Sequence, residues 1–144
     1  MSMLNSIARR AMIQTAATIH IANHRPDALR TDPKVGGHPA ACSSSAHILT
    51  SLHCKVRNVN DFVCCKPHAA PLDHVLHGLM GIMWDPKAKA WFDRDRIEQT
   101  LHHVRKFSEH GEAVLQSYHA RTDPDSFHFL PSGSVGIPPV VSGY

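Results

Sequence analysis

Apolar residues recur at near-helical spacing along much of the chain. In the first 25 residues they are Ile7, Ala11, Ile13, Ala17 and Ile21. This spacing predicts an amphipathic helix that begins near Ser6, whose side chain is suited to cap it, and that ends near Asn23. A proline-containing turn follows directly and would stop the helix.

The same periodicity predicts three further helices. The second covers residues 46–56 and carries the apolar stripe Ile48, Leu49, Leu52 and Val56. The third carries Leu72, Val75, Leu76, Leu79, Met80 and Met83. The fourth carries Ile97, Leu101, Val104 and Phe107. Asp93 or Asp95 would cap the fourth helix, and Gly111 would end it. Packing of helices around a core explains all of these stripes.

One short apolar run breaks the helical pattern. Residues 62–65 read Phe-Val-Cys-Cys, which suits a strand buried on both faces of a parallel sheet. Residues 84–91 are expected to form a loop, and residues 114–119 an extended segment. The run therefore favours an α/β protein, in which ligands bind at the carboxyl edge of the sheet.

The composition of this 144-residue chain is that of a soluble globular protein with one modest core. The net charge of +3 includes no basic block, so nucleic acid is not an expected partner. No apolar run approaches the roughly 20 residues that a membrane span needs, so no membrane partner is expected either. Thirteen histidines are unusual, and most of them are expected to be ordinary surface or boundary residues.

The cysteines bear on the cellular compartment. They are Cys42, Cys54, Cys64 and Cys65, and none of them forms a C-x-x-C pair. With no secretory signal visible, we expect buried reduced thiols in a cytoplasmic protein. A metal site of cysteine with nearby histidine is the alternative. A mitochondrial location also stays open, because residues 1–25 contain three arginines and no acidic residue.

Three turns that carry histidines stand out, and a glycine turn follows them. The first is Gly37-His38-Pro39-Ala40-Ala41, and the second is Lys66-Pro67-His68-Ala69-Ala70-Pro71. The third is Tyr118-His119, and the glycine turn is Gly133-Ser134-Val135-Gly136. Each motif alone is a weak signal, because a histidine in a turn is more often solvated than functional. Their order and spacing make them a stronger one.

In these motifs the chain resembles the N-terminal part of the thiamine-diphosphate enzymes of the transketolase superfamily. Transketolases carry a G-H-P-G-G/A turn, a strand that ends in K-G-H-A-A-P, and a histidine loop before a G-P/S-L-G-Q-G turn. The segments Ser117-Tyr118 and 127–139 lean toward the homodimeric E1 component of pyruvate dehydrogenase, with transketolase as the alternative. Pro67 departs from the family pattern, because it replaces a glycine and removes one backbone donor.

The resemblance implies a fold and a set of site residues. The fold would be a partial thiamine-diphosphate-binding domain of the PP type over residues 35–144, with a parallel sheet flanked by helices and truncated before completion. Residues 1–34 would form an N-terminal helix and connector. His38 and His119 would be catalytic, because they would face the reacting carbon of the thiazolium. His68 would contact the cofactor, as would the backbone of Gly133, Ser134, Val135 and Gly136.

The resemblance also implies what lies outside the chain. The Mg²⁺ ligands of the superfamily lie in a later G-D-G…N motif, so no metal ligand is expected in these residues. The partner would be a second copy or the missing C-terminal domains, and the substrate a 2-oxo acid or a sugar phosphate.

Two other functions stay open. One is a truncated, non-catalytic paralogue that acts as a binding or regulatory module. The other is a histidine/cysteine metal-binding protein, although its ligand spacing would be irregular. Among the histidines outside the three turns, His53, His74, His77 and His128 are expected to be structural.

Overall fold

The computed structural model describes residues 2–26, 29–31, 34–35, 37–105 and 113–126. In these residues the chain is mainly helical. Its helices are α1 (Met3–Asn23), α2 (Pro39–Ser51), α3 (Ala70–Met80) and α4 (Arg94–Leu101). A π-helical turn, Leu52–Val56, extends α2, and a 3-10 turn, Pro67–Ala69, leads into α3.

The strands are only two residues long. Strands β1 (Trp84–Asp85) and β2 (Ala90–Trp91) pair antiparallel, with Trp84 opposite Trp91. Strands β3 (Val104–Arg105) and β4 (Leu115–Gln116) pair in parallel, with Val104 opposite Leu115. In the described part of the chain no helix-flanked parallel sheet forms. The predicted α/β fold, a partial PP-type domain, is therefore wrong.

The error has a clear source at residues 62–65. Phe62 is 65% exposed, and only Val63 of the run takes part in an isolated bridge. A continuous apolar run of four residues cannot distinguish a doubly buried strand from a connector that buries alternate side chains. Here Val63 and Cys65 point into the core while Phe62 does not.

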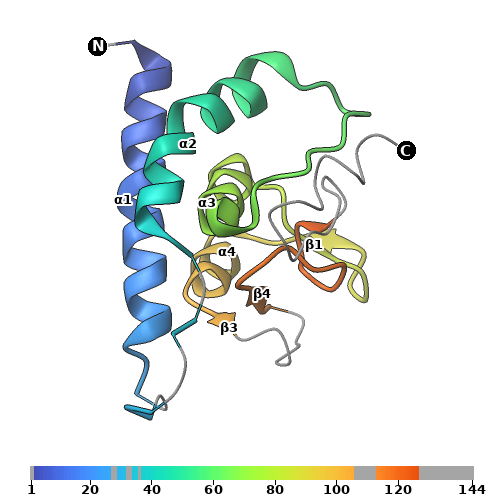
Figure 1. Ribbon diagram of the computed structural model, residues 1–144. Helices are drawn as coiled ribbons and strands as arrows, with labels where there is room; N and C mark the ends of the chain where they lie inside the picture. The colour runs from blue at the N-terminus through green and yellow to red at the C-terminus, as the bar shows by residue number, and fades with distance from the viewer. Residues whose placement is uncertain (1, 27–28, 32–33, 36, 106–112, 127–144) are drawn as a thin grey trace.

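Helix α1 runs along one side of the molecule, and α2 crosses it (Figure 1). The side chain of Ser2, rather than Ser6, caps α1 by accepting from the Asn5 N–H. The buried face of α1 is made mostly of small residues, namely Ala8, Ala11, Thr15, Thr18, Ile19 and Ala22. Small side chains let the helix backbones approach closely, so α2 and α3 pack directly against this face of α1.

The end of α1 fixes the first histidine turn. The side-chain amide of Asn23 donates to the Val35 carbonyl at 3.0 Å, and its oxygen accepts from the Val35 N–H at 2.7 Å. This paired bond anchors the chain just before Gly37 to the C-terminal end of α1.

Helix α2 begins earlier than the sequence predicts, and it turns a different face inward. Cys42, Ala46, Leu49 and Thr50 are buried, whereas Ile48 is 70% exposed and Val56 64% exposed. The predicted stripe is thus wrong at both of these apolar residues. The small residues pack because they fit against the small-residue face of α1.

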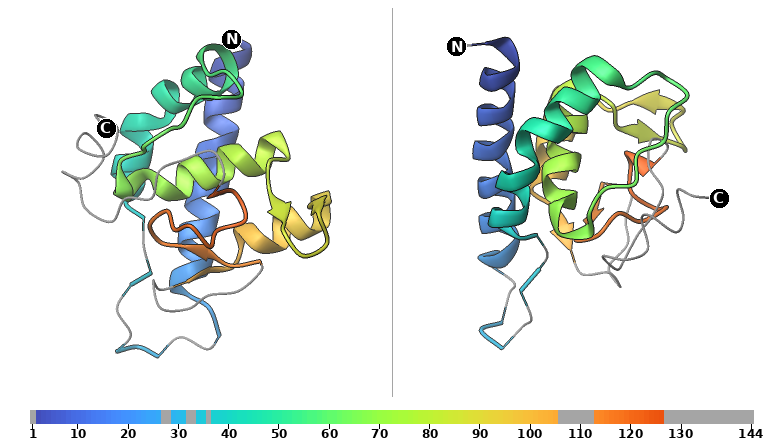
Figure 2. Two further views of the ribbon diagram at one scale, coloured as in Figure 1. Left: turned by 90° about the vertical axis from the view of Figure 1, so that its right-hand side faces the viewer. Right: turned by 45° about the horizontal axis from the view of Figure 1, so that its top comes forward.

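Helix α3 lies in the middle of the molecule, between α1 on one side and the segment after β4 on the other (Figure 2). Every residue from Ala70 to His77 is buried. The helix ends at Gly81, whose φ of 72° is the left-handed conformation that stops a helix. A helix surrounded in this way must bury polar residues as well as apolar ones.

Helix α4 is capped by Asp93, which accepts from the Arg96 N–H at 2.8 Å, so this predicted cap is confirmed. The helix ends at Leu101 and Val104 lies in β3, so the prediction that this helix continues to Gly111, which lies outside the described residues, is wrong. Within the described residues, no helix has both the length and the apolar character to cross a bilayer.

Candidate functional site

The first two histidine turns lie against each other. The backbone N–H of His38 donates to the carbonyl of His68 at 3.1 Å. Gly37 has a φ of 94°, and a Cβ placed there would lie 2.6 Å from the side chain of Pro71. Only glycine provides both this backbone conformation and this close approach. The two motifs, distant in sequence, therefore form one structural unit.

The imidazoles of these turns form a cluster with Tyr118. The rings of His38 and His68 are 5.2 Å apart, and those of His68 and Tyr118 are 6.0 Å apart. We call His38, His68 and Tyr118 the turn cluster. His38 is exposed and His68 is half-buried, so a ligand can reach both of them from solvent.

The remaining predicted site residues are placed elsewhere. His119 is only 2% exposed, and its Nε2 lies 3.0 Å from Oδ2 of Asp73. The predicted glycine turn at Gly133, Ser134, Val135 and Gly136 lies outside the described residues. The structure thus brings His38 and His68 together, and puts His119 in a second, buried group of polar side chains.

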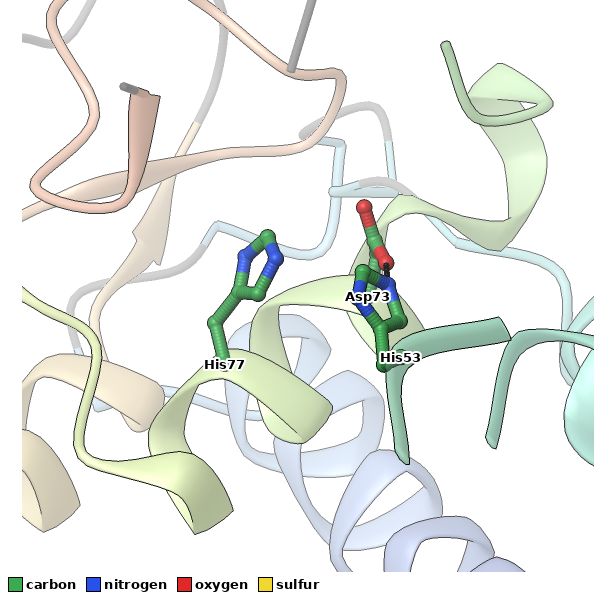
Figure 3. Close-up of side chains that lie close together, drawn as sticks. All are labelled: His53, Asp73 and His77. Atoms are coloured by element: carbon green, nitrogen blue, oxygen red, sulfur yellow. Dashed lines mark hydrogen bonds and ion pairs between the residues drawn. The ribbon is translucent and has the colours of Figure 1, made fainter. Parts of the chain in front are cut away.

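This second group, here called the buried centre, takes its residues from three parts of the chain. Its members are His53, Asp73, His74, His77, His119, Asp123 and Asp125. Helix α3 supplies three of them, the π-helical turn supplies His53, and the segment after β4 supplies the rest. Figure 3 shows His53 facing Asp73, with His77 one helical turn further along α3.

Burial of α3 explains why these residues gather. Asp73 and His77 are four residues apart and therefore lie on one face of the helix. A carboxylate that is buried must have hydrogen-bonding or charged partners, because desolvation without them is very costly. The segment after β4 and the π-helical turn bring those partners to α3. The position of the segment after β4 is fixed in part by the Trp84 N–H, which donates to the Pro124 carbonyl at 2.8 Å.

Asp73 is held by two imidazoles. Arg57 donates to Nδ1 of His53 at 3.0 Å, so His53 carries its proton on Nε2 and donates it to Oδ1 of Asp73 at 2.5 Å. His119 approaches the other carboxylate oxygen. The orientation of Asp73 is thereby fixed from both sides.

Asp125 and Asp123 hold the other side of the centre. His74 Nδ1 and His77 Nδ1 lie 2.7 Å and 2.9 Å from Oδ2 of Asp125. Asp123 accepts the backbone N–H groups of Gln116 and Ala120 at 3.1 Å and 2.8 Å. His74 Nε2 lies 3.3 Å from the Gln116 carbonyl and 3.9 Å from Oδ2 of Asp123.

Burial and the neighbouring histidines shift the pKa values of the buried aspartates in opposite directions. Burial alone would raise the pKa of Asp73, but His77, His119 and His53 hold it well below the ordinary value. The pKa of Asp125 is likewise lowered, because His74 and His77 outweigh its burial. Burial raises the pKa of Asp123 to about 7.

The histidines respond in opposite ways. Burial would lower the pKa of His74, but Asp125 and the other carboxylates raise it to about 9. Burial and the neighbouring His74 lower the pKa of His119. His74 is therefore the cation of the centre, and His119 is a neutral imidazole beside it.

The donor set of the buried centre suits a metal ion. Three overlapping groups place one ligand atom per residue within 4.8 Å of one another. They are His53–Asp73–His77, Cys65–Asp73–His119 and His74–His119–Asp123. The expectation that the chain carries no metal ligand stays a prediction, but it now stands beside three buried groups that could provide one.

The cysteines follow the predicted pattern only in part. Within the described residues, which include all four, none forms a disulfide. Cys42 and Cys65 are buried as expected, and burial raises the pKa of Cys42 to about 11. Cys54 is exposed and Cys64 is half-buried, so the prediction of burial is wrong for Cys54.

Most of the buried centre is missed by sequence reasoning. His53, His74 and His77 are predicted to be structural, and the three aspartates are not singled out; His128 lies outside the described residues. One local signal is present, the pattern Asp73-His74-x-x-His77 inside an apolar helix. Titratable residues on one face of an otherwise apolar helix indicate that this face is buried against polar partners.

Comparison with protein-family models, with curated proteins and with solved structures finds no match to this chain.

Proposed function

We propose that this chain contributes to a thiamine-diphosphate-dependent enzyme that acts on a carbon–carbon bond next to a carbonyl. The reaction would be decarboxylation of a 2-oxo acid, as in pyruvate dehydrogenase E1, or ketol transfer, as in transketolase. The observation that supports this function is the meeting of the first two histidine turns. Their sequence motifs carry the resemblance, and their backbones are bonded through His38 and His68.

The turn cluster fits the anionic end of such a cofactor. His38 is the N-cap residue of α2, and its side chain makes no capping bond. The first N–H groups of a helix are left without helical partners, and they favour negative charge. His38 and His68 can add imidazole donors at the same place. A diphosphate would thus meet backbone and side-chain donors together.

The buried centre does not fit a diphosphate. Asp73 and Asp125 are ionised carboxylates with lowered pKa values, and they would repel phosphate oxygens. The proposed cofactor therefore belongs at the turn cluster, near the N-terminal end of α3. When bound, thiamine diphosphate supplies the stabilised carbanion, and the protein supplies orientation and proton transfer.

The chain's own residues have distinct tasks in this proposal. His38, being exposed, would hydrogen-bond a substrate oxygen or carry a proton, a role that imidazoles often have in enzymes. His68, which is half-buried between His38 and Tyr118, would hold the cofactor. The role of His119 as a catalytic residue stays a prediction from the resemblance. His119 is buried against Asp73, whereas His38 is exposed.

The test is a titration of the whole chain, followed by the NMR signals of its histidine rings. Thiamine diphosphate with Mg²⁺ should shift the His38 and His68 signals in a saturable way. His47, exposed on α2, is the internal control and should not move with them. Loss of one hydrogen bond to a charged group costs about 1.5–3 kcal/mol, so His38→Ala or His68→Ala should weaken binding about tenfold or more.

Two results would contradict the proposal. One is the absence of any saturable shift at His38 and His68. The other is an equal shift of His47, which would indicate a general effect of added anion. Parallel titrations with thiamine and with inorganic diphosphate show which end of the cofactor is bound. The substrate class is tested on the native assembly, by release of CO₂ from a 2-oxo acid against consumption of a ketose phosphate.

A further inference from the structure

We propose that His74, His119 and Asp123 form a binding site for one divalent transition-metal ion, with Zn²⁺ as the reference ion. The three residues lie where the segment after β4 covers α3. Their ligand atoms are within 4.8 Å of one another, and all three side chains are buried. This site is separate from the turn cluster, and the inference does not depend on the proposed function.

His74 has the orientation that a metal ligand requires. Its Nδ1–H donates to Asp125 at 2.7 Å, which directs Nε2 toward Asp123. Metal-bound histidines commonly donate their second ring N–H to a carboxylate, which fixes the ring and makes it a better ligand. Asp125 serves this purpose, and it is itself held by His77 at 2.9 Å.

His119 has the same relationship with a different carboxylate. Its Nε2 lies 3.0 Å from Asp73, and Asp73 is fixed on its other side by His53. The rings of His74 and His119 are 4.4 Å apart. Each of the two imidazoles is therefore placed by its own aspartate.

Asp123 completes the set from within its loop. The backbone N–H groups of Gln116 and Ala120 donate to its two oxygens. These bonds fix the carboxylate plane while leaving lone pairs for a cation. Two imidazole nitrogens and one carboxylate oxygen form a ligand set typical of zinc or non-haem iron, whereas Ca²⁺ and Mg²⁺ prefer oxygen ligands alone.

The other two groups of possible ligands, which share residues with this site or with each other, fit a metal less well. In His53–Asp73–His77, the donation from Arg57 to Nδ1 of His53 leaves the proton on Nε2, the atom that faces Asp73. A metal there would have to displace this proton and break the 2.5 Å bond from His53 to Asp73, whereas at His74 it displaces an Nε2 proton whose contact with the Gln116 carbonyl is 3.3 Å. In Cys65–Asp73–His119, the thiol donates to the Lys66 carbonyl at 3.5 Å. A metal there would have to displace this proton and the Asp73–His119 contact together.

The test measures metal binding by the whole chain after treatment with a chelator. We expect one equivalent of Zn²⁺ by calorimetry and elemental analysis. Asp123→Asn and His119→Gln should weaken binding at least tenfold. Asp125→Asn, which alters a supporting carboxylate, should weaken it about 10–100-fold. Cys65→Ser should bind as the parent chain does.

Two controls keep the result specific. The exposed rings of His20 and His24 stack 4.1 Å apart at the C-terminal end of α1 and could take up metal at the surface. His24→Ala should therefore leave the one tight equivalent unchanged. Co²⁺ in the parent chain gives a readout that needs no variant. Its spectrum should lack the intense thiolate charge-transfer band that coordination by Cys65 would produce.

The proposal is overturned by absence of stoichiometric binding in the parent chain, by a thiolate band with Co²⁺, or by Asp123→Asn binding as tightly as the parent. A far-UV circular dichroism spectrum of each metal-free variant shows whether it is folded. The Co²⁺ spectrum of the parent decides whether Cys65 is a ligand even if a variant does not fold.

Discussion

Gly37 and Pro71 touch so closely that a single methyl group would not fit between them. A Cβ on Gly37 would lie 2.6 Å from Cγ of Pro71 and 3.0 Å from the side chain of Ile19. Because Pro71 opens α3 and Ile19 lies on α1, this contact joins both histidine turns to the helical core. The position of the turn cluster therefore depends on a residue that has no side chain.

Replacement of Gly37 by alanine should destabilise the protein substantially. A non-glycine residue at positive φ costs about 1–2 kcal/mol. Overpacking against Pro71 and Ile19 adds about 1–3 kcal/mol. We expect a loss of about 2–5 kcal/mol in the free energy of unfolding, measured by urea denaturation.

Gly81→Ala is the matched control for Gly37→Ala. Gly81 also has positive φ, 72°, but a Cβ there meets nothing within 4 Å. Gly81→Ala should therefore lower the free energy of unfolding only by the cost of a non-glycine residue at positive φ. Equal losses in the two variants would show that the contact with Pro71 contributes nothing.

Asp73 should be the most sensitive carboxylate of the chain. Removing one partner from a buried charged network costs about 3–5 kcal/mol, because it leaves the other groups buried without compensation. Asp73→Ala should therefore lower the free energy of unfolding by about this amount in urea denaturation. Glu98→Gln, on the exposed side of α4, should change it by less than about 0.5 kcal/mol. A small effect of Asp73→Ala would mean that water enters the buried centre.

Helix positions were largely predictable from the sequence, because each depends on local signals. Asp93 caps α4 as expected, and Gly81, inside the predicted third helix, ends α3. What could not be read locally is which side of each helix faces the core. Ile48 is exposed while Thr50 is buried, because the small-residue face of α1 selects small partners on α2.

The candidate site was predictable only where it follows a motif. His38 and His68 belong to turns that the resemblance singles out, and they do lie together. Asp125 and His74 are 51 residues apart, and their contact exists only because the segment after β4 folds onto α3. No local spacing encodes such a pair. The absence of a strand at residues 62–65 has the same origin, since strands need partners that the sequence does not identify.

The different burial of Cys42 and Cys54 can be tested by the reactivity of their thiols. The thiolate is the reactive form, and the pKa of Cys42 is raised from 9.0 to about 11 by burial. That difference alone lowers the thiolate fraction near neutral pH about 100-fold. Iodoacetamide should therefore modify exposed Cys54 much faster than Cys42 in the native protein, as followed by peptide mass spectrometry. In urea both should react alike, and similar native rates would contradict the placement of Cys42 on the buried face of α2.

The turn between β1 and β2 should make stability depend on acid pH. Asp85 accepts the backbone N–H groups of Ala88 and Lys87, and Arg96 donates to its second oxygen at 2.7 Å. These bonds lower the pKa of Asp85, the Ala88 N–H most of all and then Arg96. A carboxylate whose folded pKa lies below the unfolded value of about 3.9 stabilises the protein above that pH. This contribution is lost as the pH falls through the folded pKa.

Asp85→Asn should consequently be less stable than the parent at pH 7, and the difference should shrink as the pH falls below about 4, where the parent loses the same charge. Urea denaturation at a series of pH values measures this difference. Arg96→Gln is the partner variant, and because both changes remove one contact, the double variant should lose less than the two single losses combined. Arg96 also lies over the ring of Phe92 at 3.9 Å, so its own loss includes a packing part that does not vary with pH. A constant difference between Asp85→Asn and the parent across the acid range would mean that the carboxylate has the same pKa folded and unfolded, and that only the turn's neutral hydrogen bonds stabilise it.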